Sequence, residues 1–183
     1  MRTSVIPLQD WSFARDFDEK RWEAHMDRYR CVVDVHLVLV RGGELLWSRR
    51  ANTGYADDRL GLVSGHLEEG EDVIDAAIRE ANEEVGICLR REDLSCAHVM
   101  HHRNGSDIAR VGFFFRAERW DGDIVNREPR KCSELVWRDF SDIPADAVPY
   151  PAAAIRRILA GETFSVHGWG DPAVEVIEYL PQQ

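Results

Sequence analysis

The sequence is poor in cysteine and has no long apolar segment. Its four cysteines are widely spaced and form no C-x-x-C pair, which argues against a disulfide framework and a zinc site and favours buried thiols in a reducing cytoplasm. The longest apolar run, residues 31–40, is interrupted by Asp34 and His36 and is shorter than the roughly 20 apolar residues of a membrane span. Gln9 and Asp10 follow the first residue too closely for a signal-peptide core. We therefore expect a cytoplasmic protein without a membrane partner.

The sequence also has fewer basic than acidic residues. The 183 residues include 23 Lys and Arg against 33 Asp and Glu, a formal net charge of −10. Neither nucleic acid nor an anionic membrane surface would be attracted to such a chain. If the ligand is itself a phosphate compound, a cation has to lie between it and the protein.

The length is that of one domain with a short extension, at roughly 100–200 residues per domain. Residues 1–30 are rich in aromatic side chains, and Trp22, His25, Met26 and Tyr29 share one helical face. We predict an N-terminal helical extension over 1–30 and a main domain over 31–183.

In the main domain, short strand-like segments alternate with two amphipathic segments. Alternating or apolar patterns predict strands at 31–40, 45–50, 60–63, 94–102, 108–120, 134–140 and 174–180. Helical periodicity predicts helices at 71–85 and 151–159. The Gly42-Gly43 pair suits a tight hairpin turn, and Gly86 suits a left-handed helix cap. This order predicts an α/β fold with helices flanking a mixed sheet.

The helix predicted at 71–85 carries three carboxylates on one face, away from its apolar stripe. Glu80, Glu83 and Glu84 stand at i, i+3 and i+4, where like charges repel and destabilise a helix. A compensating cation would remove this cost, and carboxylate oxygens favour Mg²⁺ or Mn²⁺. A solvated acidic face is the alternative that this feature alone leaves open.

The segment from Gly65 to Ile87 resembles the Nudix box, G-x5-E-x7-R-E-U-x-E-E-x-G-U, at every fixed position. The matching residues are Gly65, Glu71, Arg79, Glu80, Glu83, Glu84 and Gly86, with Ala81 and Ile87 at the two apolar positions. The resemblance implies a Nudix α/β/α sandwich with a mixed sheet. It also implies Mg²⁺- or Mn²⁺-dependent hydrolysis of a nucleoside diphosphate linked to another group.

By position in the box, the metal ligands would be Glu80, Glu83, Glu84 and a backbone carbonyl at Ser64. Glu71 and Arg79 would form a bracing pair. A glutamate not fully engaged with metal, Glu83 or Glu84, would take the proton from water. Ser64 is a departure, because many relatives have a second glycine before the x5 segment.

A second resemblance concerns residues 126–132, Asn-Arg-Glu-Pro-Arg-Lys-Cys, followed by Trp137. It is similar to the N-x-E-P-x-K-C…W segment of MutT-like nucleoside triphosphate pyrophosphatases. Glu128 is the candidate for an additional metal-assisting glutamate, with Glu134 second. Lys131 would meet a phosphate or pair with Glu128. A turn at a sheet edge is the structural alternative.

Further substrate contacts are expected from His66, whose loop also resembles that of the MutT-like group, and from Arg50. Solvated charge is the alternative for Arg50. The histidines at 98, 101 and 102 fit ordinary strand-surface or turn positions, with contact to a base or phosphate as the alternative. Residues 113–115, three phenylalanines, fit the core, with base stacking as the alternative.

These observations favour cleavage of a nucleoside triphosphate to the monophosphate and pyrophosphate. Three alternatives stay open: an ADP-ribose or nucleotide-sugar pyrophosphatase, a tailoring hydrolase acting on a phosphorylated metabolite, and a nucleotide-sensing module without activity. The expected partner is a small nucleotide or nucleoside diphosphate derivative, and a homodimer is left open.

Overall fold

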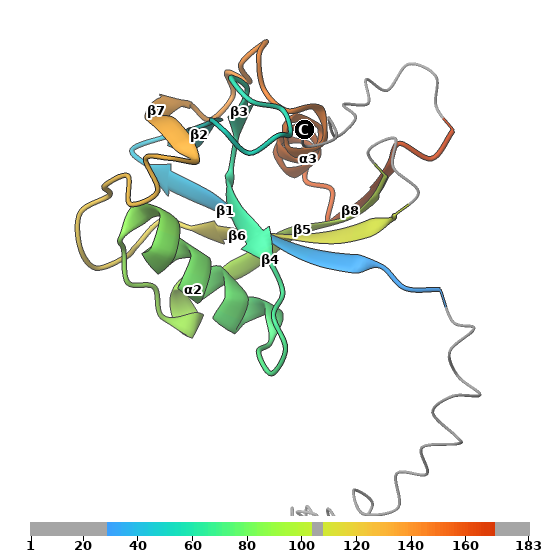
Figure 1. Ribbon diagram of the computed structural model, residues 1–183, viewed down its shortest axis with the longest axis horizontal. Coiled ribbons are helices and arrows are strands. Elements are labelled where there is room, and N and C mark those ends of the chain that lie inside the picture. Colours follow the sequence, from blue (N-terminus) through green and yellow to red (C-terminus); the bar gives the residue numbers. More distant parts are fainter. Residues whose placement is uncertain (1–28, 104–107, 171–183) are drawn as a thin grey trace, which may run out of the picture. The chain divides into compact units, whose positions relative to one another are not determined.

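The computed structural model describes residues 29–103 and 108–170 (Figure 1). The predicted extension lies outside the described residues except for Tyr29 and Arg30, and so does the strand predicted at 174–180. The division of the chain at residue 30 thus stays a prediction. Among the described helices, none has the length and apolar character needed to cross a membrane.

Eight strands form one mixed sheet within the described part of the chain. They are β1 Val32–Arg41, β2 Glu44–Arg50, β3 Leu60–Gly61, β4 Val63–His66, β5 Ser95–His102, β6 Arg110–Ala117, β7 Cys132–Asp139 and β8 Phe164–His167.

The strand order is β3-β2-β1-β6-β5-β8, with β4 also paired to β1 and β7 to β2. The β1–β6 and β5–β8 pairs are parallel, and the others are antiparallel. The central strand β1 pairs with β6 along most of its length, with β4 over residues 34–37 and with β2 at its end. The mixed sheet expected from the sequence is confirmed.

Two α-helices, α2 Val73–Val85 and α3 Pro149–Leu159, pack on opposite faces of this sheet (Figure 1). Alternate residues of β1 show the division. Leu37 and Leu39 pack in the core under α2, whereas Val38 and Val40 pack in the core under α3. The layers are thus α/β/α, as the Nudix resemblance implies.

Helix α2 is closed at both ends by its own sequence. Asp72 caps its first turn by accepting from the backbone N–H groups of Ile74 and Asp75. Gly86 ends it in the left-handed conformation, with φ of 77°, which glycine adopts at little cost. The predicted boundaries hold to within two residues at the N-terminus.

Some sequence predictions need correction. Strand β8 was not predicted, because its four residues carry only a short alternation. The cysteines are unpaired, but Cys88 and Cys96 are exposed and only Cys132 is buried. The histidines at 98 and 102 are fully buried rather than at the strand surface, because the face of β5 that carries them packs against α3. The placement of Phe114 and Phe115 in the core is confirmed.

Candidate active site

Helix α2 and strand β4 meet at a contact that excludes any side chain at Gly65. A Cβ atom there would collide with the carboxylate of Glu80. Strand β4 can therefore approach α2 closely only with glycine at this position. The close approach buries Glu80, which is 9% exposed, and holds the loop of residues 67–71 over the start of the helix.

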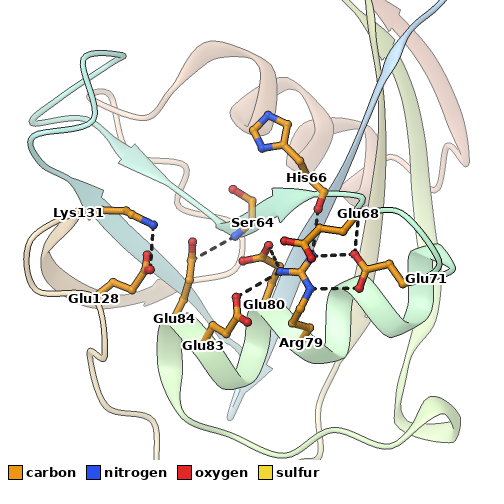
Figure 2. Close-up of polar contacts among 10 residues, drawn as sticks. All are labelled: Ser64, His66, Glu68, Glu71, Arg79, Glu80, Glu83, Glu84, Glu128 and Lys131. Atoms are coloured by element: carbon orange, nitrogen blue, oxygen red, sulfur yellow. Dashed lines mark hydrogen bonds and ion pairs between the residues drawn. The ribbon is translucent and has the colours of Figure 1, made fainter.

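Arg79 ties this loop to the carboxylates of the helix (Figure 2). Its guanidinium donates to both oxygens of Glu71, at 2.7 and 3.1 Å, and to the backbone carbonyl of His66 at 3.0 Å. Its Nη1 also donates to Glu80 at 2.6 Å and to Glu83 at 3.2 Å. The contact expected between Arg79 and Glu71 is thus present, and Arg79 also neutralises part of the carboxylate face.

Glu84 lies next to strand β4 and has no cationic side chain within ion-pair distance among the described residues. Its Oε2 accepts from the backbone N–H of Ser64 at 3.3 Å. Burial, together with the nearby charges of Glu80 and Glu128, raises the pKa of Glu84 to about 8. Burial also raises the pKa of Glu80, against the lowering effect of Arg79. A cation placed between these carboxylates would relieve both costs.

The loop of residues 126–132 supplies the opposite wall. Asn126 closes it, donating to the carbonyl of Cys132 at 2.7 Å and accepting from the N–H of Glu128 at 3.1 Å. The side chain of Glu128 faces α2 and pairs with Lys131 at 2.9 Å (Figure 2). Glu134, the second candidate, is directed elsewhere, since it is 57% exposed and pairs with Arg49.

A single pocket of about 430 Å³ joins these parts, a volume within the range of roughly 300–1,000 Å³ typical of small-molecule sites. The lining includes these site residues predicted from the sequence: Arg50, Ser64, His66, Arg79, Glu80, Glu83, Glu84, Glu128 and Lys131. Glu71 lies behind Arg79, and Glu134 is not part of the lining. Arg50 is held in the wall by the Thr53 hydroxyl at 3.0 Å and the Tyr55 carbonyl at 2.9 Å.

The donor set suits a hard divalent cation. Glu80, Glu83, Glu84 and Glu128 line the same pocket, and oxygen ligands of this kind favour Mg²⁺ or Mn²⁺ over zinc. Among residues 29–103 and 108–170, no three acidic, histidine or cysteine side chains are already gathered into a closed metal cage. Arg79 instead pairs with Glu80 and Glu83, and Lys131 pairs with Glu128.

The pocket also extends to a polar cluster that sequence analysis missed. Asp34 and His36 project from β1 toward the α3 side of the sheet, and Arg110 of β6 donates to Asp34 at 3.0 and 3.2 Å. Arg110 also lies 3.0 Å from Nε2 of His66. The only sequence signal was that Asp34 and His36 interrupt an apolar strand.

Burial and neighbouring groups shift the pKa values of Asp34 and His36 in this cluster. Burial would raise the pKa of Asp34, but His102 and the neighbouring cations outweigh it and leave this pKa below its usual value. Burial lowers the pKa of His36 to about 3, so its imidazole is neutral near pH 7.

The chain is similar to known proteins of one family in both sequence and fold. The sequence pattern of the NUDIX domain family matches residues 29–159. The chain is similar to the MutT NUDIX hydrolase from Burkholderia pseudomallei, at 25% identity and a TM-score of 0.63, over 69% of this chain and 97% of that one.

Two further solved structures share the fold. The MutT protein from Methanosarcina mazei Go1 is 17% identical with a TM-score of 0.63, over 73% of this chain and 96% of that one. A NUDIX hydrolase from Nitrosomonas europaea is 22% identical with a TM-score of 0.58, over 74% of this chain and 93% of that one.

Proposed function

The chain belongs to the NUDIX family of pyrophosphohydrolases, and we propose that it cleaves a nucleoside triphosphate to the monophosphate and pyrophosphate. Hydrolysis of a nucleoside diphosphate linked to another group follows from family membership. The choice of a triphosphate is supported by one placement above all. Glu128 and Lys131, from the segment that resembles the triphosphate group, line the same pocket as the helix carboxylates.

A divalent cation, Mg²⁺ or Mn²⁺, is part of this proposal. Glu80, Glu83, Glu84 and Glu128 would hold it, together with the backbone carbonyl of Ser64. When bound, it would neutralise phosphate oxygens and lower the pKa of a coordinated water. A protein of net charge −10 needs such a cation to accept a polyphosphate.

The chain's own groups would then handle the proton and the phosphates. Glu83 or Glu84 would accept the proton of the attacking water at a carboxylate oxygen. Glu83 is the more open of the two to solvent, with its side chain 54% exposed, whereas Glu84 is fixed against Ser64. Arg79, held by Glu71, would fix the position of the helix carboxylates relative to the loop of residues 67–71.

Three cationic or polar side chains at the rim would bind the substrate. Arg50 is fixed in the wall by Thr53 and Tyr55, so little ordering is needed when a phosphate binds. Lys131 would exchange its contact with Glu128 for a phosphate oxygen once a metal ion engages that glutamate. His66 lies beside Arg110 at the other end of the pocket. Cytoplasmic location and a homodimer stay predictions.

A substrate panel tests the proposal. The purified full chain, with Mg²⁺, would be given common and oxidised nucleoside triphosphates, ADP-ribose and a nucleotide sugar, and the products identified by chromatography. We expect pyrophosphate and a monophosphate from at least one triphosphate, with ADP-ribose a poor substrate. A clear preference in kcat/KM for ADP-ribose or a nucleotide sugar would overturn the triphosphate assignment. Glu92→Gln, an exposed carboxylate outside the pocket, serves as the control variant.

A further inference from the structure

The loop of residues 51–59, which joins β2 to β3, has an unusual backbone. Asn52, Ala56 and Asp58 have φ angles of 55°, 49° and 67°, in the left-handed region that residues other than glycine rarely adopt. Strained backbone of this kind persists only where surrounding contacts hold it, and it is concentrated at functional sites. The loop begins directly after Arg50, one of the proposed substrate-binding residues, so its shape bears on the position of Arg50.

Contacts on two sides hold the loop in place. Near its end, the backbone N–H of Asp58 donates to the carbonyl of Arg50 at 2.9 Å. Near its start, the side chain of Asn52 donates to the carbonyl of Arg130 at 2.9 Å. The loop is therefore attached both to the end of β2 and to the segment of residues 126–132 on the opposite wall of the pocket.

Asp57 closes the turn inside this loop. Its carboxylate accepts from the hydroxyl of Thr53 at 2.7 Å and from the backbone N–H groups of Thr53 and Gly54 at 2.9 and 3.2 Å. These hydrogen bonds, that of the hydroxyl foremost, hold the pKa of Asp57 below its usual value, so the carboxylate is ionised near pH 7. An ionised acceptor with three donors fixes the position of Thr53.

Thr53 connects Asp57 to Arg50. A hydroxyl donates one proton and can accept a hydrogen bond at the same time. The ionised carboxylate of Asp57, at 2.7 Å, is a stronger acceptor for this proton than the carbonyl of Tyr55, at 2.9 Å. The hydroxyl oxygen then accepts from Nη2 of Arg50 at 3.0 Å. Asp57 thus acts on the guanidinium through Thr53.

The position of the guanidinium decides what Arg50 offers to a substrate. Its Nε donates to the carbonyl of Tyr55 at 2.9 Å, and its central carbon lies 5.4 Å from the centre of the Tyr55 ring. Arg50 lines the pocket, and a guanidinium has more N–H groups than these two contacts use. The remaining donors are available to phosphate oxygens. A side chain that is already fixed also loses less freedom on binding than a mobile one.

We propose that Asp57 is a positioning residue for substrate binding, which holds Arg50 in the pocket wall through the hydroxyl of Thr53. This inference rests on the proposed function only in that Arg50 binds a phosphate group of the substrate. It requires no particular base and no third phosphate. Because Arg50 would contact the phosphate both before and during the reaction, loss of Asp57 should change KM rather than kcat.

Steady-state kinetics of Asp57 variants test the proposal. KM and kcat would be measured in Mg²⁺ with whichever substrate of the panel is turned over fastest, and Tm would show that each variant is folded. Asp57→Ala should raise KM by about threefold to tenfold, the range expected when one long side chain has to be ordered on binding, with kcat nearly unchanged. Asp57→Asn keeps one oxygen that can accept from Thr53 and should recover part of the loss. An unchanged KM in Asp57→Ala would overturn the proposal.

Two further variants assign the effect to the contact through Thr53. Thr53→Val keeps the shape of the side chain but lacks the hydroxyl, so it should raise KM about as much as Asp57→Ala. In a chain that already carries Arg50→Ala, Asp57→Ala should cause no further rise in KM, because the side chain that it positions is gone. A full additional rise in the double variant would show that Asp57 acts independently of Arg50 and would refute the proposal.

Asp58 provides a matched control in the same loop. It is exposed, as Asp57 is, but its side chain forms no hydrogen bond or ion pair with another residue in the described part of the chain. Asp58→Asn removes the same charge, and asparagine tolerates a left-handed backbone. KM should therefore stay at the wild-type value. A rise equal to that of Asp57→Ala would mean that the charge of the loop, not the contact with Thr53, controls binding.

The outcome of these measurements is separable from that of the substrate panel. If the panel favours ADP-ribose or a nucleotide sugar, the triphosphate assignment fails, but the Asp57 variants are still tested with that substrate, since it also carries a diphosphate. If a triphosphate is cleaved and Asp57→Ala leaves KM unchanged, the proposed function stands and the role of Asp57 fails.

Discussion

Replacing Arg79 by alanine should weaken both stability and turnover. The side chain is 22% exposed and donates to three carboxylates and one carbonyl. Without it, Glu71 and Glu80 lose their cationic partner, and the loop of residues 67–71 loses its main connection to α2. Breaking a buried ion pair from one side costs about 3–5 kcal/mol.

The partial exposure of Arg79 reduces that figure, and we expect the variant to lose about 2–3 kcal/mol. For a chain of this size, each kcal/mol shifts Tm by roughly 2–4 °C, so Tm in EDTA should fall by about 5–10 °C. Without Arg79 the carboxylates of α2 and the loop of residues 67–71 would no longer hold their relative positions. We therefore expect kcat/KM to fall by about tenfold or more.

Glu84→Gln, unlike Arg79→Ala, should not lower the stability of the fold. It removes one charge from a crowded set and leaves the contact with Ser64 available, since an amide oxygen also accepts. We expect Tm in EDTA to stay constant or rise, while activity falls.

Thermal melts in EDTA and steady-state rates in Mg²⁺ would be measured for both variants. Arg91→Ala is the control, because Arg91 also bridges two carboxylates, Asp72 and Asp75, but at the surface and outside the pocket. Its Tm and rate should change little. Equal melting behaviour of Arg79→Ala and Glu84→Gln would refute the division into a bracing residue and a catalytic one.

Three further predictions follow from the pocket. Because the pKa of Glu84 rises from 4.5 to about 8 on folding, the unfolded chain loses this proton first, and stability in EDTA should fall as pH rises between about 5 and 8; melts of Glu84→Gln should show a shallower decline. Glu128→Gln should reduce kcat/KM in Mg²⁺ more than Glu134→Gln, and a larger loss in Glu134→Gln would contradict the placement of Glu128. Gly65→Ala should displace the Glu80 carboxylate and reduce the rate by about tenfold or more, whereas Gly61→Ala, whose Cβ would meet its nearest atom at 3.8 Å, should be tolerated.

The part of the pocket formed by α2 and the loop before it was predictable, because its residues are close in sequence. The spacing of Glu80, Glu83 and Glu84 places them on one helical face in any helix, and Glu71 reaches Arg79 across two turns. Local periodicity likewise located α2 and most strands, since amphipathic patterns are set by neighbouring residues.

The cluster of Asp34, His36, Arg110 and Tyr150 at the α3 end of the pocket was not predictable, because its residues meet only through the sheet and α3. Asp34 and Arg110 are joined by the parallel pairing of β1 with β6, and Tyr150 is added by α3. Such contacts depend on strand order and register, which one sequence does not specify locally. The short strand β8 was missed for the same reason, since its pairing with β5 defines it.

Metal-dependent hydrolysis at the carboxylates of α2 is tested most directly by the turnover of the preferred nucleoside triphosphate by the wild-type chain and by Glu84→Gln. Pyrophosphate release would be measured with saturating Mg²⁺ and again with excess EDTA. The expected result is that EDTA abolishes release and that Glu84→Gln lowers kcat by about 10²-fold or more, as happens when metal or base geometry is lost. Full activity in EDTA, or an unaffected Glu84→Gln variant, would contradict it.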